Sequence, residues 1–255
     1  MSKRDSVWWA NVIAGVLHLA QSVAVFGLLG SGTGTESDWP ILASGFEGEV
    51  LWLHRYPLGW LVPIFPLLSA TNHFASAFSK TYDEYTRKTK TNPVRWIEYS
   101  MSAAIMLWII GTLSGVNDVG TLASIVVLNI ALMMVGYMAE ALGPKHPQAA
   151  LLQSVGFAIH LAIWTNIITS FYTTISLSDT SVPDVVYSII WVEFVLFSTF
   201  GVLSALGSAG TTNFEQTEIG YIVLSFISKT LLTWLAFGGV FASNERIVEP
   251  TPIPP

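Results

Sequence analysis

The sequence contains no cysteine and carries little charge. None of its 255 residues is Cys and only 11% are Asp, Glu, Lys or Arg, whereas a soluble domain usually has about 25%. The absence of cysteine excludes disulfides and thiolate-based zinc sites, and we expect no other metal site. The net charge of -6, with no long basic block, argues against nucleic acid as a partner.

Hydrophobic residues are correspondingly abundant. They make up 52% of the chain, and the mean hydropathy is +0.56. A helix that crosses a bilayer needs about 20 mostly apolar residues. Seven stretches meet this requirement, namely residues 7–29, 55–79, 94–115, 118–139, 151–173, 184–207 and 217–242. We therefore predict an all-α membrane protein, a seven-transmembrane-helix bundle that forms a single domain over residues 1–255 and lies in the cell (plasma) membrane.

The connections between these stretches carry local signals. Asn92-Pro93 predicts an N-cap followed by the first helical residue, and Gly143-Pro144 predicts the end of the fourth helix. Residues 80–93 have the composition of a polar, basic loop. Residues 30–54 form either a small hairpin, with partial alternation over 46–52, or an irregular loop.

The distribution of basic residues predicts the orientation in the membrane. Cytoplasmic segments collect Lys and Arg. If the N-terminus is inside, the inner segments hold Lys3, Arg4, Lys80, Arg87, Lys88, Lys90, Arg95 and Lys145, and the outer segments hold only Arg55 and Arg246. We therefore expect a cytoplasmic N-terminus and an extracellular C-terminus.

Three charged residues fall within the predicted spans, where charge is costly and indicates function. Lys229 lies in the middle of the seventh span, Glu98 in the third and Glu193 in the sixth. A desolvated lysine amine can form a Schiff base with an aldehyde, and a buried cation needs a counterion. Glu98 is the natural counterion, although helix rise leaves a mismatch of about 10 Å. A lysine chain that leans inward, or a seventh helix that protrudes, would close it. The simpler alternative is a structural Lys–Glu pair.

Other polar residues in the spans receive more modest interpretations. Glu193 either bonds a polar group such as Asn166 or lies at a subunit interface, and we assign it no proton-transfer role. We interpret His160 as a packing residue. Glu140 and Glu218, at the ends of the fourth and seventh spans, are best explained by hydrogen bonding at an interface.

Seven spans, a lysine in the middle of the last and a carboxylate in the third resemble a microbial retinal protein. Three details narrow the resemblance: the inverted orientation, the stretch Arg95-Trp96-Ile97-Glu98-Tyr99-Ser100, and Ser225 where related pigments usually have Asp. Together with His18, His73 and Trp234, they are similar to the heliorhodopsins over essentially all seven spans. The resemblance implies covalently bound all-trans retinal as a protonated Schiff base on Lys229, with Glu98 as counterion.

Further site residues follow from position and from this resemblance. We expect a cytoplasmic-side polar cavity near the Schiff base, and aromatic walls suited to a conjugated chain. The expected cavity residues are His18, His73, Ser69, Tyr99 and Gln21, beside Ser225, and the expected walls are Trp164, Phe194 and Trp234. Asn129 faces either the pocket or a neighbouring helix.

The resulting functional prediction is a retinal-binding light sensor that is not an enzyme and does not pump ions. Two alternatives stay open: a light-driven ion transporter or light-gated channel, and a retinal-free transporter with a Lys–Glu ion pair. We expect a homodimer in the lipid bilayer and a cytoplasmic signalling partner of unknown identity. The dimer expectation rests partly on apolar residues in the outer loop, which are Trp39, Phe46, Leu51 and Trp52.

Overall fold

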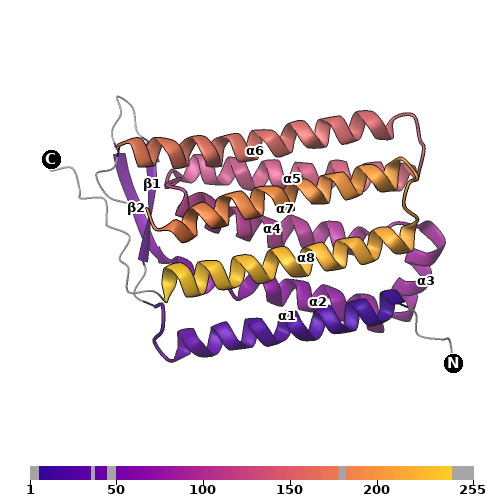
Figure 1. Ribbon diagram of the computed structural model, residues 1–255, viewed down its shortest axis with the longest axis horizontal. Coiled ribbons are helices and arrows are strands. Elements are labelled where there is room, and N and C mark those ends of the chain that lie inside the picture. Colours follow the sequence, from indigo (N-terminus) through magenta and orange to yellow (C-terminus); the bar gives the residue numbers. More distant parts are fainter. Residues whose placement is uncertain (1–5, 36–37, 45–49, 178–181, 243–255) are drawn as a thin grey trace.

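The computed structural model describes residues 6–35, 38–44, 50–177 and 182–242. Lys3, Arg4, Phe46, Arg246 and the C-terminal tail therefore lie outside the described residues. Within them, helices lie side by side along one axis and a two-stranded hairpin covers one end (Figure 1). The helices are α1 Ser6–Gly30, α2 Ile64–Phe78, α3 Lys80–Thr89, α4 Pro93–Leu113, α5 Val119–Leu142, α6 Ala149–Leu177, α7 Asp184–Ser208 and α8 Phe214–Ala236.

Shorter elements complete the architecture. The strands are β1 Asp38–Ser44 and β2 Val50–Pro57, a 3-10 turn Leu58–Leu61 leads towards α2, and a π-helical turn Phe237–Phe241 extends α8. In the described part of the chain, seven helical segments are long and apolar enough to cross a membrane. The prediction of an all-α, seven-helix membrane protein is confirmed, with boundaries within a few residues of those expected.

Helix α3 is an addition to the expected set. Residues 80–93 were predicted to form a polar loop, and this prediction is wrong for Lys80–Thr89. The Ser79 hydroxyl accepts a hydrogen bond from the Tyr82 amide at 3.3 Å, which caps the helix. Asp83 and Arg87, four residues apart, form an ion pair at 2.8 Å. Local capping and pairing therefore make a short helix without any buried face.

The predicted helix boundaries have the expected chemistry. The Asn92 side chain accepts a hydrogen bond from the Arg95 amide at 3.0 Å, and Pro93 is the first residue of α4. Helix α5 ends at Leu142, and Gly143 follows with φ +79°, a conformation that favours glycine. Both signals are confirmed.

The segment before α2 forms the hairpin rather than an irregular loop. Strands β1 and β2 pair antiparallel, with Asp38 opposite Pro57 and Ser44 opposite Val50. Strand β2 includes residues 50–52 of the alternating stretch that suggested the hairpin, and residues 46–49 lie outside the described residues. Tyr56 attaches the hairpin to α4, because its hydroxyl oxygen accepts from Trp108 Nε1 at 2.7 Å and bonds Thr112 at 3.1 Å.

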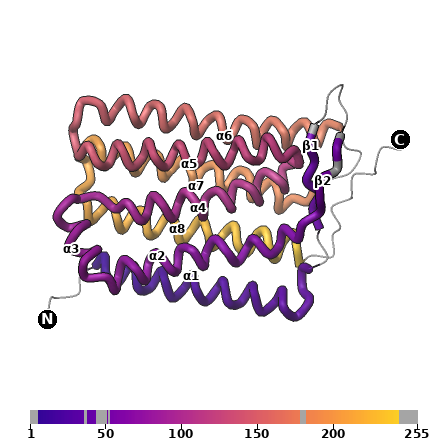
Figure 2. The backbone as a smooth tube through the Cα atoms, turned by 180° about the vertical axis from the view of Figure 1, so that it is seen from behind, coloured from indigo at the N-terminus to yellow at the C-terminus, as the bar shows by residue number. Residues whose placement is uncertain are grey.

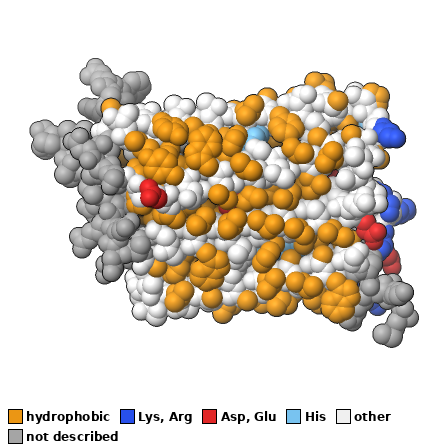
Figure 3. Space-filling view, viewed as in Figure 1, with side chains coloured by type: hydrophobic (Ala, Val, Ile, Leu, Met, Phe, Trp, Pro, Cys, Tyr) orange, Lys and Arg blue, Asp and Glu red, His pale blue; other side chains and the backbone are white. Residues whose placement is uncertain are grey.

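Two ends of the bundle can be distinguished. The α3 end carries α3 and the start of α1, and the hairpin end carries β1 and β2, as the views from both sides show (Figures 1 and 2). Helix α4 lies centrally. Of the residues in its most apolar 18-residue stretch, 72% are buried, against 17% in the corresponding stretches of α5 and α7. On the face shown in Figure 3, hydrophobic side chains cover much of the surface between the two ends, and Lys and Arg side chains gather at the α3 end.

Close packing of α4 against α5 depends on Gly136. A Cβ atom at this position would lie 2.4 Å from the Trp96 ring. We expect Gly136→Ala to destabilise the protein by about 1–3 kcal/mol, the usual cost of overpacking. Thermal unfolding in detergent measures this, with Gly27→Ala as the control because a Cβ at Gly27 meets nothing within 4 Å. Equal melting temperatures for the two variants would contradict the prediction.

Candidate functional site

The ionisable groups of α4 and α8 meet in the interior. Lys229 is 3% exposed and Glu98 4%, and Lys229 Nζ lies 3.0 Å from Glu98 Oε1. Lys229 Nζ also donates to Ser225 Oγ at 3.0 Å, one turn nearer the α3 end. The lysine chain therefore leans towards the α3 end, which is one of the two ways in which the mismatch in helix level was expected to close.

Neighbouring residues hold this pair in place. Ser69 on α2 donates to Glu98 Oε1 at 2.7 Å, so one carboxylate oxygen receives both a hydroxyl and an ammonium group. The Lys229 nitrogen lies 4.8 Å from the centre of the Tyr99 ring, within range for a cation–π interaction. The Tyr99 hydroxyl is held by the Tyr221 carbonyl oxygen at 3.2 Å. The amine is thus enclosed by one charge and several fixed dipoles.

Two stacked histidines continue the polar region on α1 and α2. The rings of His18 and His73 lie 5.5 Å apart and are inclined by 6°. His18 Nδ1 bonds Gln21 Nε2 at 2.8 Å, and His73 Nδ1 bonds Asn11 Oδ1 at 2.8 Å. Because Ser69 precedes His73 by one helical turn, these groups extend from Glu98 towards the α3 end. The structure therefore places these groups in one buried polar cluster, whereas of the residues expected in the polar cavity only Tyr99 and Ser225 line the cavity described below.

Asn11 is an additional member that was not in the predicted set. It is 7% exposed and accepts from His73, because an amide oxygen cannot donate. Its position seven residues before His18, on the same helix face, was the available signal. His18 Nε2, by contrast, is buried without a partner in the described residues. Each ring is therefore held through its Nδ1 atom, and Nε2 of His18 is left without a partner.

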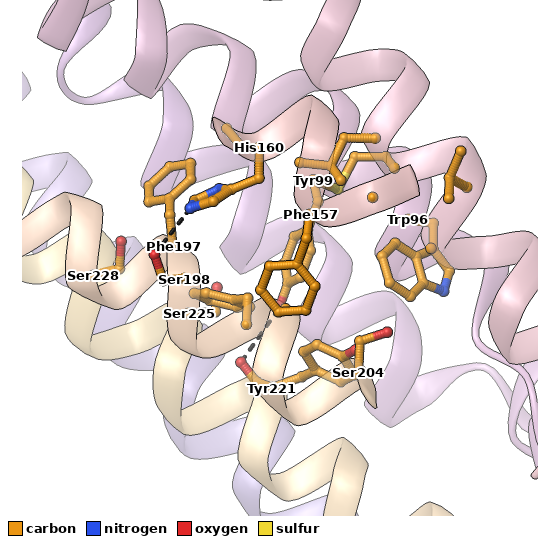
Figure 4. Close-up of a pocket in the computed structure, with 18 of the residues that line it drawn as sticks. Trp96, Tyr99, Phe157, His160, Phe197, Ser198, Ser204, Tyr221, Ser225 and Ser228 are labelled. Carbon is orange, nitrogen blue, oxygen red and sulfur yellow. Dashed lines mark hydrogen bonds between the residues drawn. The ribbon is translucent and has the colours of Figure 1, made fainter. Parts of the chain in front are cut away.

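A partly open cavity lined by Lys229 extends along the bundle (Figure 4). Its ends are Ser228 and His160 on one side and Trp96 and Ser204 on the other. The wall is mostly apolar and aromatic, with lining residues that include Tyr99, Met106, Leu132, Met133, Phe157, Phe197, Phe200 and Tyr221. A mostly apolar cavity with a few convergent polar groups is typical of a small-molecule site.

The expected aromatic walls are placed differently from one another. Trp164 is 1% exposed and lies behind the cavity wall, with its ring 5.8 Å from that of Phe197. Phe194 packs edge-on against Trp164 at 5.4 Å in the same layer. The prediction that Trp234 forms part of the wall is wrong, because Trp234 is 41% exposed and does not line the cavity. Five residues turn a helix by about 140° beyond a full turn, so Trp234 does not share the face of Lys229.

Asn129 faces a neighbouring helix rather than the cavity. Its side-chain amide lies 3.4 Å from the carbonyl oxygens of Tyr99 and Ser100 on α4, and it is 1% exposed. Of the two positions left open by the sequence, the contact with α4 is the one observed.

His160 was interpreted as a packing residue, but in the structure it also lines the cavity and forms a hydrogen bond. Its Nε2 bonds Ser198 Oγ at 2.9 Å, and both residues line the cavity. The ring also stacks on Phe194 at 5.9 Å. The missed signal was spacing, because His160 lies four residues before Trp164 on one helix face.

Glu193 also differs from its predicted surroundings. It is 0% exposed, so it lies inside the chain and not at a subunit interface. Its partner is Ser228 on α8, which donates to Oε2 at 2.6 Å. Asn166 is exposed and donates to its own helix backbone, so the suggested Asn166 contact is wrong.

A buried charge cluster closes the α3 end of the bundle. Arg95 forms ion pairs with Glu140 of α5 and Glu218 of α8. Asn92 donates to the same two carboxylates: its backbone N–H to Glu140 at 2.6 Å and its side-chain Nδ2 to Glu218 at 2.7 Å. The interface interpretation of Glu140 and Glu218 is therefore replaced by contacts within the chain. These residues join α4, α5 and α8 at one point.

Tyr82 connects α3 to this cluster. Its hydroxyl bonds the Asn92 side chain and accepts from the Val94 amide at 3.2 Å. Burial raises the pKa of Tyr82 to about 12, so the phenol stays neutral. Helix α3 is consequently anchored to the start of α4.

The cavity residues fit an elongated, conjugated aldehyde. Lys229 supplies a buried amine on the cavity wall, Glu98 supplies one compensating charge, and aromatic rings line the length beyond them.

Comparisons with known proteins give a consistent result. The family model for heliorhodopsin matches residues 7–241. A search of curated proteins finds no match. The structure is similar to a light-driven proton pump from Leptosphaeria maculans, with a TM-score of 0.71, 13% identity, and coverage of 93% of this chain and 96% of the other.

Two further solved structures are also similar to this one. The thermophilic rhodopsin of Rubrobacter xylanophilus has a TM-score of 0.69, 14% identity, and coverage of 92% and 96%. The transmembrane domain of the Salpingoeca rosetta rhodopsin phosphodiesterase has a TM-score of 0.65, 14% identity, and coverage of 90% and 81%. At such identities these similarities show the seven-helix rhodopsin fold alone. The family match, over nearly the whole of the chain, shows more: this protein belongs to the heliorhodopsin family.

Proposed function

We propose that this heliorhodopsin is a light sensor that carries all-trans retinal on Lys229. The observation that supports this best is the buried Lys229–Glu98 pair on the wall of an aromatic cavity. When bound, retinal supplies a chromophore that absorbs visible light and changes shape. The family match supports a retinal-binding photoreceptor in general, and heliorhodopsins are generally not enzymes, so we propose no enzymatic activity for this chain.

The residues around Lys229 have separable roles in this proposal. Lys229 holds the covalent linkage, and Glu98 compensates the positive charge on its nitrogen. Ser69 orients the Glu98 carboxylate, and Ser225 lies within hydrogen-bond distance of the same nitrogen. Tyr99 covers the site with its ring face. This arrangement keeps the charge of the linkage paired in a region without bulk water.

Light then acts on the polar groups towards the α3 end. A proton displaced from the Lys229 nitrogen has Glu98 as its nearest acceptor, and the histidine pair lies beyond Ser69. Imidazole exchanges protons near neutral pH in water, so His73 and His18 suit a relay. We propose that the α3 end faces the cytoplasm, because the Lys and Arg side chains visible in Figure 3 gather there.

The direct test of this proposal is colour. Adding all-trans retinal to the expressed protein should produce a visible absorption band. A protein that stays colourless and folded would support the retinal-free alternative, in which Lys229 and Glu98 form an ion pair linked to substrate transport.

We predict no sustained ion transport in light. Towards the hairpin end, α4 presents Ile109 and Ile110, both fully buried, and no residue that could hold a proton. Illuminated cells or vesicles should therefore show no steady photocurrent at any holding potential and no lasting pH change. Glu193 favours the second candidate, a light-driven transporter or channel, since it is a buried carboxyl group that is hydrogen-bonded to Ser228, next to Lys229. A steady current that disappears in Glu193→Gln would establish that candidate.

We also propose a homodimer that uses the hairpin. Leu51 and Leu53 of β2 are 50% and 55% exposed, and exposed apolar residues at one site favour association. Trp39 instead packs against the bundle core, and Phe46 and the side chain of Trp52 lie outside the described part of the structure. Crosslinking in membranes should give a dimer that Leu51→Lys/Leu53→Lys weakens, and an unchanged monomer would contradict this. The cytoplasmic partner of the sensor stays without a structural candidate.

A further inference from the structure

Glu193 is a carboxyl group with only one neutral partner. It is 0% exposed, and its Oε2 accepts from Ser228 Oγ at 2.6 Å. Its Oε1 has no hydrogen-bond partner in the described residues. Ser228 directly precedes Lys229 and lines the cavity beside it. A buried carboxyl group, with one oxygen hydrogen-bonded and the other without a partner, is therefore bonded to the residue next to the proposed attachment point.

The charge balance argues against an ionised Glu193. The nearby cation, Lys229, is already paired with Glu98 at 3.0 Å. Glu193 forms no ion pair among the described residues, whose buried pairs involve Glu98, Glu140 and Glu218. A buried carboxylate with a single hydroxyl donor costs several kcal/mol in order-of-magnitude terms. Adding a proton removes this cost.

The surroundings of Glu193 on the hairpin side are apolar. Ile189 and Ile190, one turn earlier on α7, are 0% and 1% exposed, and Leu232, one turn beyond Ser228 on α8, is 0% exposed. These residues belong to one hydrophobic cluster. Glu98 differs, because it receives both the Ser69 hydroxyl and the Lys229 ammonium group. The two carboxyl groups near Lys229 therefore differ in their hydrogen-bond donors: Glu98 has a cation and a hydroxyl group, and Glu193 has a hydroxyl group alone.

We infer that Glu193 is a neutral carboxylic acid that acts, through Ser228, as an uncharged second proton site beside Lys229. Its proton sits on Oε1, and Oε2 is the carbonyl oxygen that accepts from Ser228. Glu98 then supplies the single negative charge next to the linkage. Because Ser228 is bonded to Glu193 and directly precedes Lys229 on α8, a movement of Lys229 in light changes the hydrogen bond to Glu193. Only this last step depends on the proposed function.

The protonation state can be tested without retinal. The infrared spectrum of wild-type apoprotein minus that of Glu193→Gln should show the carbonyl band of a protonated carboxylic acid. In Ser228→Ala this band should move to higher frequency, since the carbonyl loses its donor. A difference spectrum with carboxylate bands instead would overturn the inference. Thermal unfolding of Glu193→Gln checks its fold, and Glu193→Asp provides a second carboxyl-bearing variant if the amide does not fold.

The connection to light requires the retinal-bound protein. Glu193→Gln exchanges one neutral group for another, so its visible absorption should stay close to that of the wild type, whereas Glu98→Gln should shift. A red shift in Glu193→Gln as large as that in Glu98→Gln would show that Glu193 is charged. The light-minus-dark infrared spectrum should contain a carboxylic-acid band pair that is lost in Glu193→Gln; its absence in the wild type would overturn the coupling. If no pigment forms, the proposed function fails, while the apoprotein spectrum still decides the protonation state.

Discussion

Replacement of Lys229 by alanine should abolish the visible pigment completely. The only amine on the cavity wall would be gone, and an aldehyde has no other lysine in the described interior with which to form a covalent bond. The variant should still insert into the membrane, because the seven apolar spans are unchanged. Absorption after addition of retinal measures the effect, and membrane fractionation measures insertion. A Lys229→Ala protein that still forms a reducible adduct would refute the assignment.

The same substitution leaves Glu98 buried without its cation, which should destabilise the protein. Removing one partner of a buried ion pair typically costs about 3–5 kcal/mol. The double variant Lys229→Ala/Glu98→Gln should recover part of this loss, because no unpaired charge is then buried. Colourless protein in both variants, with higher thermal stability in the double variant, separates loss of the attachment site from loss of the fold.

The second large effect is expected from Glu98→Gln. The carboxylate is 3.0 Å from the Lys229 nitrogen and is the only one paired with it among the described residues. Loss of an opposite charge disfavours the protonated linkage, so the visible form should be lost at a lower pH than in the wild type. The absorption maximum should move to longer wavelength, since the charge of the chromophore is held less firmly at the nitrogen. Titration followed by absorption spectroscopy measures both effects.

Glu193→Gln is the matched control for this prediction. Both substitutions replace a buried glutamate near Lys229 by its amide, but only Glu98 is ion-paired with the lysine. An unchanged spectrum and titration in Glu98→Gln would indicate that Glu193 or a bound anion is the counterion instead.

The fold could largely be predicted from the sequence because its signals are local and strong. Long apolar runs define the spans, and Asn92-Pro93 and Gly143 mark helix ends through backbone chemistry that depends on few neighbours. Helix α3 was missed because it has no buried face and depends on the Ser79 cap and the Asp83–Arg87 pair. Hydrophobic periodicity gives no signal for such a helix.

The site could be predicted where residue type alone carried the chemistry. An ionisable residue in a span must find a partner, which is why Lys229, Glu98 and Ser69 meet as expected. Which face of a helix a given aromatic residue occupies is a weaker inference, and Trp234 was placed incorrectly.

Contacts between distant helices were the hardest to foresee. Glu140, 45 residues beyond Arg95, and Glu218, 123 residues beyond it, become its partners only after the bundle has formed. The same holds for Ser228 and Glu193, which are 35 residues apart. Spacing within one helix carries no information on such pairs. Glu140 and Glu218 were therefore assigned to hydrogen bonding at an interface, and Glu193 either to a polar group such as Asn166 or to a subunit interface.

The central claim is that Lys229 is the site of covalent attachment. Its most direct test is to add all-trans retinal, reduce the pigment with borohydride, digest the protein and locate the modified peptide by mass spectrometry. The account predicts a retinyl group on the peptide that contains Lys229 and on no other peptide. A retinyl group on a different lysine, or a coloured protein that yields no modified peptide, would contradict it.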